Sequence, residues 1–433
     1  MNRVKRLLVP FKRRALRGTR RALHWYMSAP PRKRDLDGAD RRVLILLMSA
    51  WGMGGTIRAA HNMAGHLASK GYDVEIGSVI RLRGEAFFSD GLPEGVDVIA
   101  LDDHRADATP RWLRPVRNLL RRRDSLLANP NDIHQERWWN LWVDVQLARL
   151  LHRRAGFLVT TRPSLNLISA EYASPALVKV GLEQINLGAW GKALRSSMAR
   201  HYPKLDVLVG LTATDLEAYD RLLGGKLRLQ RIPNTVYPMG GPRPDLSTKR
   251  LVAAGRFMNQ KGFDLLIPAF AKIAADFPDW SLRIHGKGPL KQQLEQMIDE
   301  SGLSERIELA GPANDMGAAL AEASIFVLSS RFEGFPLILI EAMSKGLAVV
   351  SYDCPTGPSD IVDDHENGIL VPAKDIDALA AGMREVMADE QLRRRVAAAA
   401  IESAKAYEIG SIGPHWEELL TSLTNARDGQ GGP

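Results

Sequence analysis

Residues 43–70 read VLILLMSAWGMGGTIRAAHNMAGHLASK, and the pattern of this stretch indicates the fold class. Its first six residues, Val43 to Met48, form a continuous apolar run of strand length, and a glycine-rich turn follows. After the turn, the spacing of apolar residues predicts a helix from Thr56 to Lys70, which Gly71 ends. The residues near one face of this helix are Ile57, Ala60, Ala64, Leu67 and Ala68.

The same order of strand, turn and helix continues along the chain. In the N-terminal half we expect further strands at Asp73–Ile80, Val98–Leu101, Phe157–Thr160, Leu177–Leu182, Val207–Leu211 and Leu229–Ile232. In the C-terminal half we expect them at Arg250–Ala254, Ser281–His285, Arg306–Leu309, Ile325–Leu328, Ala348–Ser351 and Gly368–Val371, with helices such as Phe263–Phe277 and Leu290–Ser301 between them. Alternation of this kind predicts an α/β fold, in which helices cover parallel sheets.

A segment rich in Pro and Gly divides the chain in two. Residues 237–249, YPMGGPRPDLSTK, have no periodicity and separate two blocks that each restart with a strand. We therefore predict a basic leader at 1–42, a first domain at 43–236, a second at 249–408, and a C-terminal helix and tail at 409–433. Two doubly wound domains are expected to face each other across a cleft, with ligands bound beyond the carboxyl ends of the strands.

Composition excludes several classes of protein. The chain has 433 residues, 45% of them hydrophobic, but no apolar run long enough for a membrane-spanning helix and none of signal-peptide length near its start. We therefore expect a cytoplasmic protein. The single cysteine, Cys354, excludes an internal disulfide and is interpreted as a small apolar filler.

The positive charge is concentrated in the leader. Residues 1–42 contain 14 Lys and Arg against three Asp, a net charge of +11, whereas the remaining 391 residues carry −3. Apolar residues are spaced among these cations, so we predict that residues 1–42 contact the anionic inner face of the cell membrane peripherally. A solvated, disordered tail is the plain alternative, and binding to nucleic acid is not expected.

Three motifs follow strands and could bind a ligand. The first is the glycine turn with Gly54 and Gly55, which could admit a phosphate to a helix N-terminus or be only a tight turn. It does not fit the dinucleotide fingerprint, because Ile57 stands where a third glycine is needed and no acidic residue lies in 78–81. The second motif carries Arg256 and Lys261, which suit paired phosphate oxygens but could also be ordinary surface cations.

The third motif, RFEGFPLILIEAMSKG at 331–346, holds two glutamates around an apolar run. A loop over Glu333–Pro336 and a helix over Leu337–Lys345 are expected. Glu341 lies beyond the first helical turn, where a complement to the helix dipole counts little, so it favours a hydroxyl pair such as a ribose. Glu333 could accept from a sugar hydroxyl, although the dipole explains it tolerably.

Together these motifs resemble a known family. GRFMNQKGFDLL, HGKGPL, SSRFEGFPLILIEAMSKGLAVVSYDCPTG and NGILVPAKDIDAL occur in the order and spacing of the retaining glycosyltransferases of family four, which have the two-domain GT-B fold and include bacterial cell-envelope enzymes. The resemblance covers residues 43–407 and is densest from Val252 to Leu379. It implies an enzyme, a hexosyltransferase that uses a nucleoside diphosphate sugar and retains anomeric configuration.

The resemblance also implies roles for individual residues. Arg256 and Lys261 would bind the diphosphate, Glu341 the ribose, and Glu333 would lie against the donor sugar. Backbone amides of Gly334, Phe335, Pro336 and Leu337 would surround the sugar and distal phosphate, except that proline has no amide hydrogen to donate. Gly54 and Gly55 would close on that phosphate from the other domain. Fixed cations and helix termini stabilise the departing diphosphate, so no metal is expected.

One position departs from the family. Many relatives have a histidine in the first domain that contacts the donor sugar, and Gln184 stands at the matching place. An amide can bond a hydroxyl but cannot carry positive charge or transfer a proton, so a catalytically silent sugar-nucleotide-binding protein is the alternative function. Gln184 could also be only structural.

The acceptor side is expected in the first domain. Its segment 103–154 places tryptophans among arginines, a combination that suits sugar faces and anionic headgroups or polymers, although core packing of the tryptophans is equally open. We expect an envelope polymer or a lipid-linked acceptor. A uridine donor is favoured over a guanosine one only by its frequency in the family.

Overall fold

The structure is a computed structural model that describes residues 17–51, 54–82, 93–105, 108–132, 138–237 and 239–430, with the backbone alone for 428–430. The chain forms two compact units. The first contains residues up to Gly210, then Leu216–Arg231 and the part of the chain from Gly413; the second contains Leu211–Asp215 and Ile232–Ile412.

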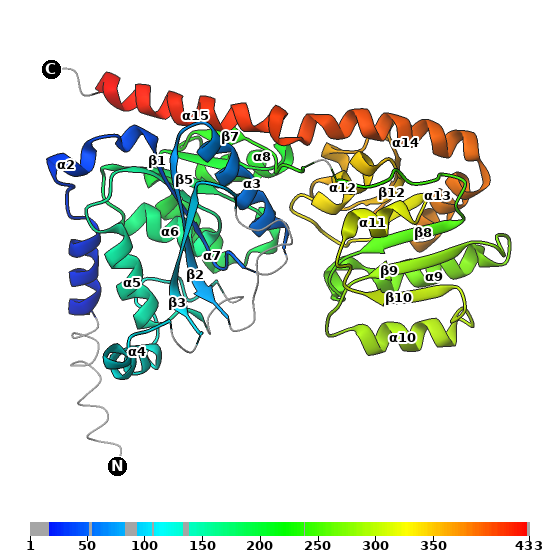
Figure 1. Ribbon diagram of the computed structural model, residues 1–433, viewed down its shortest axis with the longest axis horizontal. Helices are drawn as coiled ribbons and strands as arrows, with labels where there is room; N and C mark the ends of the chain where they lie inside the picture. The colour runs from blue at the N-terminus through cyan, green and yellow to red at the C-terminus, as the bar shows by residue number, and fades with distance from the viewer. Residues whose placement is uncertain are drawn as a thin grey trace, which may run out of the picture. The chain divides into compact units, whose positions relative to one another are not determined.

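The first unit is built on a seven-stranded parallel sheet with the order β3-β2-β1-β4-β5-β6-β7. Its strands are β1 (Arg42–Leu47), β2 (Asp73–Arg81), β3 (Val96–Asp103), β4 (Gly156–Thr160), β5 (Leu177–Leu182), β6 (Val207–Gly210) and β7 (Leu229–Arg231). The helices are α2 (Lys33–Leu36), α3 (Gly55–Ser69), α4 (Arg114–Arg121), α5 (Leu141–Leu151), α6 (Pro163–Tyr172), α7 (Lys192–His201) and α8 (Ala213–Leu223) (Figure 1).

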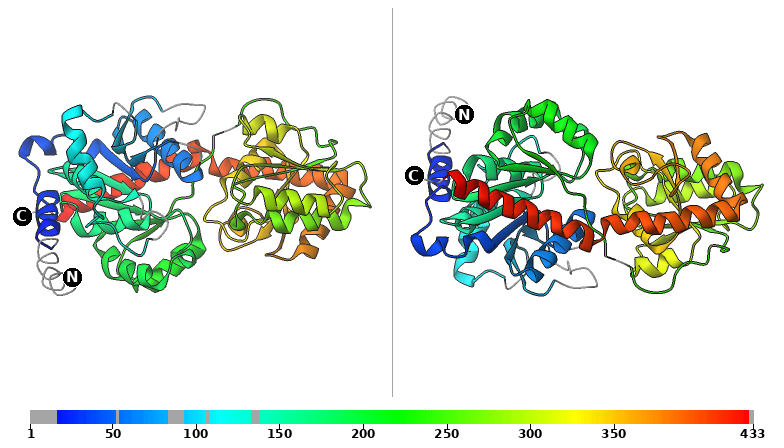
Figure 2. Two further views of the ribbon diagram at one scale, coloured as in Figure 1. Left: turned by 90° about the horizontal axis from the view of Figure 1, so that it is seen from below. Right: turned by 90° about the horizontal axis from the view of Figure 1, so that it is seen from above.

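The second unit has a six-stranded parallel sheet with the order β10-β9-β8-β11-β12-β13. Its strands are β8 (Arg250–Ala254), β9 (Ser281–His285), β10 (Ile307–Gly311), β11 (Ile325–Leu328), β12 (Ala348–Asp353) and β13 (Ile369–Pro372). Its helices are α9 (Phe263–Ala274), α10 (Lys291–Glu300), α11 (Met316–Ala321), α12 (Leu337–Lys345), α13 (Ile376–Ala388) and α14 (Glu390–Ala404). Helices lie on both faces of each sheet (Figure 2).

The predicted α/β class with two doubly wound parallel sheets is confirmed. Strands read as continuous apolar runs are buried on both faces: Phe157–Thr160 and Ile325–Leu328 are buried throughout. This is the pattern that helices on both sides of a parallel sheet require. Each sheet reverses its strand order once, between β1 and β4 in the first unit and between β8 and β11 in the second.

The last helix is not the separate C-terminal segment that the sequence predicts at 409–433. α15 runs from Ile409 to Gln430, and its residues from Gly413 on belong to the first unit. There His66 Nε2 lies 2.8 Å from Glu417 Oε1, and a side chain at position 413 would collide with the His66 ring. Arg427 donates to the backbone oxygens of Ala176 and Leu177, at 3.0 and 2.6 Å. The C-terminal helix is therefore a structural part of the first unit.

The described part of the leader also packs on the first unit. Residues 17–27 are helical, and Met27 is fully buried. Arg20 Nε donates to Tyr172 Oη at 2.6 Å, and the Tyr26 and His152 rings stack with their centroids 3.8 Å apart. The remaining leader residues, 1–16, with most of the basic apolar repeat, lie outside the described residues.

Candidate functional site

Two of the predicted motifs meet at the switch point of the second sheet. β8 and β11 are far apart in sequence but neighbours in the sheet, with Leu251 opposite Ile325 and Val252 opposite Phe326. The loops that follow them, residues 255–262 and 329–336, therefore leave the same edge side by side. In open α/β sheets this is the place where ligands bind.

A lysine from one loop pairs with a glutamate from the other. Lys261 Nζ donates to Glu333 Oε1 at 2.7 Å, and both side chains are largely buried. Ser330 Oγ donates to the same carboxylate oxygen. The Lys261 stem lies across Gly255, where a Cβ would come within 3.1 Å of its methylene groups. The lack of a side chain at Gly255 thus leaves room for the Lys261 side chain to reach Glu333.

Further contacts hold the two loops in register. Arg331 makes a bidentate ion pair with Asp264, with both N–O distances 2.7 Å, and donates to the Asn259 oxygen at 2.8 Å. Gly262 has φ +64°, and a Cβ there would lie 2.0 Å from the Ser329 backbone oxygen. Only glycine fits this position, because it tolerates both the left-handed backbone and the contact.

Arg256 is exposed beside this junction. Its guanidinium makes no hydrogen bond or ion pair with any residue that the structure describes. The HGKG motif after β9 braces the backbone on which it stands: Phe257 N donates to Lys287 O at 2.9 Å, and side chains at Gly286 or Gly288 would overlap the backbone of Gly255 or Phe257. A fixed backbone thus presents an available planar cation.

The segment from Gly334 to Leu337 enters α12 in a defined shape. Glu333 N donates to Pro355 O at 2.9 Å, and Thr356 N donates to Glu333 O at 3.2 Å. Thr356 Oγ1 also lies 3.2 Å from Asp215 Oδ2. The rings of Phe335 and Tyr407 pack edge to face, with their centroids 5.5 Å apart. These contacts on both sides of the segment fix the orientation of the first backbone amides of α12.

Glu341 lies in α12 and is only 6% exposed. It is therefore not a solvated surface carboxylate, and this burial disfavours the alternative in which Glu341 only complements the helix dipole from solvent. Glu333 is equally buried, at 6%. Burial, and to a smaller extent the negative charge of Glu333, raises the pKa of the Cys354 thiol to about 12. Cys354 is thus an inert, buried filler, as expected.

The first unit carries the remaining predicted residues at the carboxyl edge of its own sheet. Gly54 and Gly55 are exposed at the start of α3, directly after β1, and a Cβ at position 54 would meet only Ile57, at 3.9 Å. Gln184 follows β5 in the loop to the 3-10 turn Leu187–Ala189 and is half-buried. The glycine at position 54 is thus not required by internal packing.

A buried carboxyl lies next to Gln184. Glu183 is 3% exposed, and Asn166 Nδ2 donates to its Oε1 at 2.8 Å, while Tyr202 Oη donates to the same oxygen at 2.5 Å. Burial raises the pKa of Glu183 to about 7, although these hydrogen bonds oppose the shift. The loop that carries Gln184 therefore starts from a group that titrates near neutrality.

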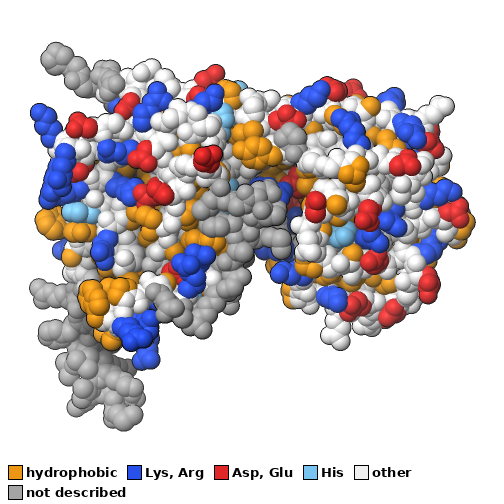
Figure 3. All heavy atoms as spheres, viewed as in Figure 1, with side chains coloured by type: hydrophobic (Ala, Val, Ile, Leu, Met, Phe, Trp, Pro, Cys, Tyr) orange, Lys and Arg blue, Asp and Glu red, His pale blue; other side chains and the backbone are white. Residues whose placement is uncertain are grey.

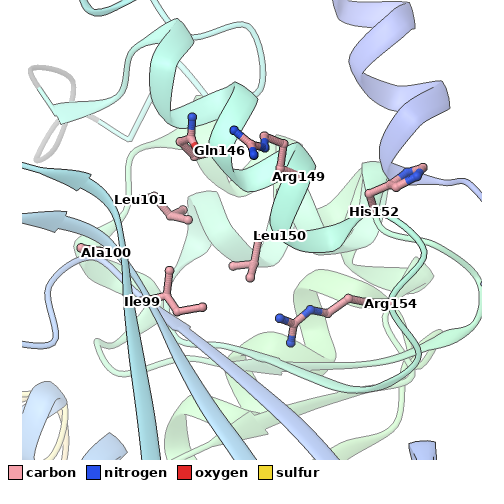
Figure 4. A pocket seen from close by; sticks show the side chains of 8 residues that line it. All are labelled: Ile99, Ala100, Leu101, Gln146, Arg149, Leu150, His152 and Arg154. Atoms are coloured by element: carbon pink, nitrogen blue, oxygen red, sulfur yellow. The ribbon is translucent and has the colours of Figure 1, made fainter. Parts of the chain in front are cut away.

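The tryptophans of the acceptor segment divide into two sets. Trp139 and Trp142 are buried, and Trp142 Nε1 donates to Leu101 O at 3.2 Å, so core packing is correct for these two. Trp112 is 77% exposed. A cavity of about 390 Å³ lies between β3 and α5, and Figure 4 shows its lining. The lining residues are Ile99, Ala100, Leu101, Gln146, Arg149, Leu150, His152 and Arg154.

Membrane-spanning helices and clusters of metal ligands are both absent from the described residues. In these ranges no helix is both long and apolar enough to cross a bilayer. Nor do three or more His, Cys, Asp or Glu side chains come together there as metal ligands. Asp375 caps α13 by accepting from Ala378 N at 2.9 Å, and Asp377, in the first turn, pairs with Lys272 at 2.8 Å.

Sequence reasoning missed the residues that hold the site in place. Ser330, Arg331, Asp264 and Thr356 contact Glu333 or its loop but were not singled out. Ser330 directly precedes the glutamate motif and Arg331 is its first residue, so their position was a usable signal. Asp264 and Thr356 are distant in sequence, and only the strand order shows that they are neighbours.

Known proteins resemble this chain in sequence and in fold. Residues 242–403 match the family model of glycosyl transferases group 1. The chain is 35% identical over 395 residues to an exopolysaccharide phosphotransferase of Streptomyces coelicolor, a match that covers 89% of this chain but only 41% of that protein. It is 24% identical over 393 residues to an uncharacterized glycosyltransferase of Haemophilus influenzae, covering 88% of this chain and all of that protein.

Among solved structures, a variant of S. aureus TarM in complex with fondaparinux, alpha-GlcNAc-glycerol and UDP has a TM-score of 0.69 at 15% identity, covering 88% of this chain and 99% of that one. At this identity the likeness concerns the fold. The chain therefore has the GT-B fold of the glycosyltransferases, and its segment 242–403, which includes the loops after β8 and β11, matches the family model of the glycosyl transferases group 1.

Proposed function

We propose that this protein is a retaining hexosyltransferase, which moves a sugar from a nucleoside diphosphate donor to a cell-envelope, polyol-phosphate or lipid-linked acceptor. The observation that carries the proposal is the junction of the β8 and β11 loops, where Lys261 bonds Glu333 and the Arg256 guanidinium stands available. The name of the Streptomyces relative, an exopolysaccharide phosphotransferase, supports an envelope acceptor.

The chemistry follows from the charges. Breaking the bond between the anomeric carbon and the phosphate oxygen leaves negative charge on the departing diphosphate. Arg256 and Lys261 would stabilise that charge, and the first amides of α12 would add to it. Glu333 would accept from a sugar hydroxyl, and Glu341 from the ribose. Because these cations supply the positive charge, we propose that the reaction needs no divalent cation and persists in EDTA.

Retention at the anomeric carbon is part of this proposal. The departing phosphate would take the acceptor's proton on the face where it leaves, so the new bond forms on that same face. A product with inverted configuration, assigned by NMR of its anomeric proton, would remove retention from the proposal but not the transfer itself.

A second function competes because the Streptomyces relative is called a phosphotransferase. The two reactions leave different nucleotides. Transfer of the sugar breaks the anomeric C–O bond and releases a nucleoside diphosphate, whereas transfer of a sugar phosphate breaks the P–O–P bridge and releases a nucleoside monophosphate. A silent binding protein, which Gln184 favours, releases neither.

One experiment separates these functions. A thermal-shift screen over sugar nucleotides identifies the donor, because a ligand that binds only the folded state raises Tm. The purified protein is then incubated with that donor, with and without glycerol phosphate polymer, and the released nucleotide is quantified. We expect slow release of the diphosphate, lost in Lys261→Ala and Glu333→Ala. Release of the monophosphate, or binding without release, contradicts the proposal.

We also propose that the protein works at the cytoplasmic face of the membrane, with the basic leader as a contact. Residues 1–16 hold six of the leader's 14 cations. A chain that lacks residues 2–16 should bind vesicles of anionic lipid more weakly than the full chain. Equal co-sedimentation of the two would contradict a role for this segment.

A further inference from the structure

The helix α4 exposes an apolar face to solvent. Trp112, in the 3-10 turn Arg111–Leu113, is 77% exposed, Leu119 is 57% exposed and Val116 is 48% exposed. Spacings of four and three residues place these side chains along one side of the turn and helix. A surface helix in a globular protein ordinarily buries its apolar side and exposes its charges.

The opposite face of α4 is charged and buried. Arg117 is only 7% exposed, and its Nη2 donates to Asp102 Oδ1 at 2.8 Å, while its Nη1 donates to Thr109 Oγ1 at 2.8 Å. Arg121 Nε lies 3.1 Å from the second oxygen of Asp102. These bonds fix the rotation of the helix, because turning its apolar side inward would remove both arginine partners of the buried Asp102.

The surroundings of the apolar face are strongly basic. Residues 108–123 contain six arginines and no acidic residue. Arg117 and Arg121 are engaged with Asp102, but Arg111, Arg122 and Arg123 are exposed. Figure 3 shows hydrophobic side chains beside Lys and Arg side chains over α4. We call these residues the α4 surface: Arg111, Trp112, Val116, Leu119, Arg122 and Arg123.

We propose that the α4 surface docks on an anionic lipid bilayer, with its three apolar side chains in the headgroup region and its arginines on lipid phosphates. The apolar side chains and the arginines together identify a bilayer as the partner of this surface. Cations alone would suit any polyanion, but exposed Val116 and Leu119 gain nothing from a hydrated polymer and gain burial in a membrane interface. Tryptophan is favoured at that interface, and each arginine is attracted by the anionic leaflet.

No residue of the α4 surface belongs to the leader, residues 1–42, or to the loops after β8 and β11, so the inference does not depend on the proposed function. Its test needs a local readout, since residues 1–16 could bind vesicles by themselves. The only cysteine, Cys354, is buried, so a cysteine introduced by Leu119→Cys can be labelled with an environment-sensitive dye. Lys226→Cys, at an exposed position of the same unit, is the matched control.

We expect the dye at position 119 to brighten with vesicles that contain phosphatidylglycerol and to stay unchanged with phosphatidylcholine alone, while the dye at 226 responds to neither. The triple variant Trp112→Ser, Val116→Ser, Leu119→Ser should lower the vesicle partition coefficient of the full chain at least about tenfold. Arg122→Glu with Arg123→Glu should lower it by more than about tenfold. The control pair Arg221→Glu with Lys226→Glu, also exposed, should leave it within about twofold.

Three results would overturn the proposal. The dye at 119 could stay unchanged while the protein co-sediments, which would assign binding to the leader. Its signal could instead rise with protein concentration in the absence of vesicles, which would assign the surface to a second copy of the chain. It could also respond to a soluble anionic polysaccharide but not to vesicles, which would assign it to a polymer.

Discussion

Lys261 Nζ and Glu333 Oε1 are 2.7 Å apart although 72 residues separate them in the chain. The pair joins the loops of two adjacent strands at the switch point of the second sheet. In this pair each charge satisfies the other. Under the proposed function, a bound donor would exchange this contact for phosphate on the lysine and a sugar hydroxyl on the glutamate.

Replacement of Lys261 by alanine should lower kcat by about 10²- to 10³-fold, because one preorganised donor to the developing charge is lost. The matched control is Lys272→Ala, which removes an exposed lysine that pairs with Asp377 at 2.8 Å in the same unit. That pair is exposed, so its loss should leave turnover unchanged. Steady-state release of nucleotide measures both variants, and equal rates would show that Lys261 does not act on the diphosphate.

Glu341→Gln should weaken binding of the donor nucleotide by about ten- to a hundredfold, since hydrogen bonds to a charged group are stronger than those to an amide. Titration calorimetry with the 2′-deoxy form of the nucleotide gives the control. Removal of the hydroxyl should weaken binding to the wild type much more than to the variant. Equal losses in both proteins would show that the buried carboxylate does not contact the ribose.

Gly286→Ala should lower the free energy of unfolding by more than about 2 kcal/mol, because its Cβ would lie 1.9 Å from the Gly255 backbone oxygen. Gly240→Ala is the control in the same unit, with no atom within 4 Å of its new methyl group. Urea denaturation compares the two. A stable Gly286→Ala protein would show that the loops after β8 and β9 are not packed as described.

Glu183 should make the stability of the first unit depend on pH. Its folded pKa, about 7, is above the usual value of 4.5, so the folded state holds a proton that the unfolded state has lost between these values. The contribution of Glu183 to the free energy of unfolding is therefore fully present below about pH 4.5 and is lost as pH rises toward 7, by at most about 3 kcal/mol. Asp144, whose pKa burial raises to about 6, acts in the same direction.

The variant Glu183→Gln isolates the contribution of this one group. Its amide keeps an acceptor for Tyr202 and Asn166 but cannot ionise, so denaturation at pH 5 and pH 8 should show a smaller difference than in the wild type. An unchanged difference would show that Glu183 is already ionised at pH 5.

Much of the second unit could be predicted from sequence because its strands are uninterrupted apolar runs. β8, β9, β11 and α12 have the predicted bounds, and the loops with Arg256 and Glu333 lie at the ends of β8 and β11. Predicted bounds elsewhere missed by a few residues, as at β3, whose exposed Asp97 and half-buried Asp103 lengthen it beyond its apolar part.

The contacts between these elements could not be predicted, because they depend on strand order. The pairing of Lys261 with Glu333, and of Arg331 with Asp264, follows from β8 and β11 being neighbours. The orientation of α4, with its apolar side exposed, could not be predicted either. The sequence does not distinguish its arginines, and only the bond to the buried Asp102 separates Arg117 from Arg122. The return of α15 to the first unit rests on His66 and Arg427, which no local pattern marks.

Hydrogen exchange tests whether the β8 and β11 loops hold a nucleoside diphosphate. Exchange is measured with and without UDP, GDP, ADP and dTDP, in the wild type and in Arg256→Ala with Lys261→Ala. We predict that one nucleotide protects residues 255–262 and 333–345 in the wild type and not in the variant. Protection confined to other segments, or none with any of the four, would show that these loops do not hold the nucleotide.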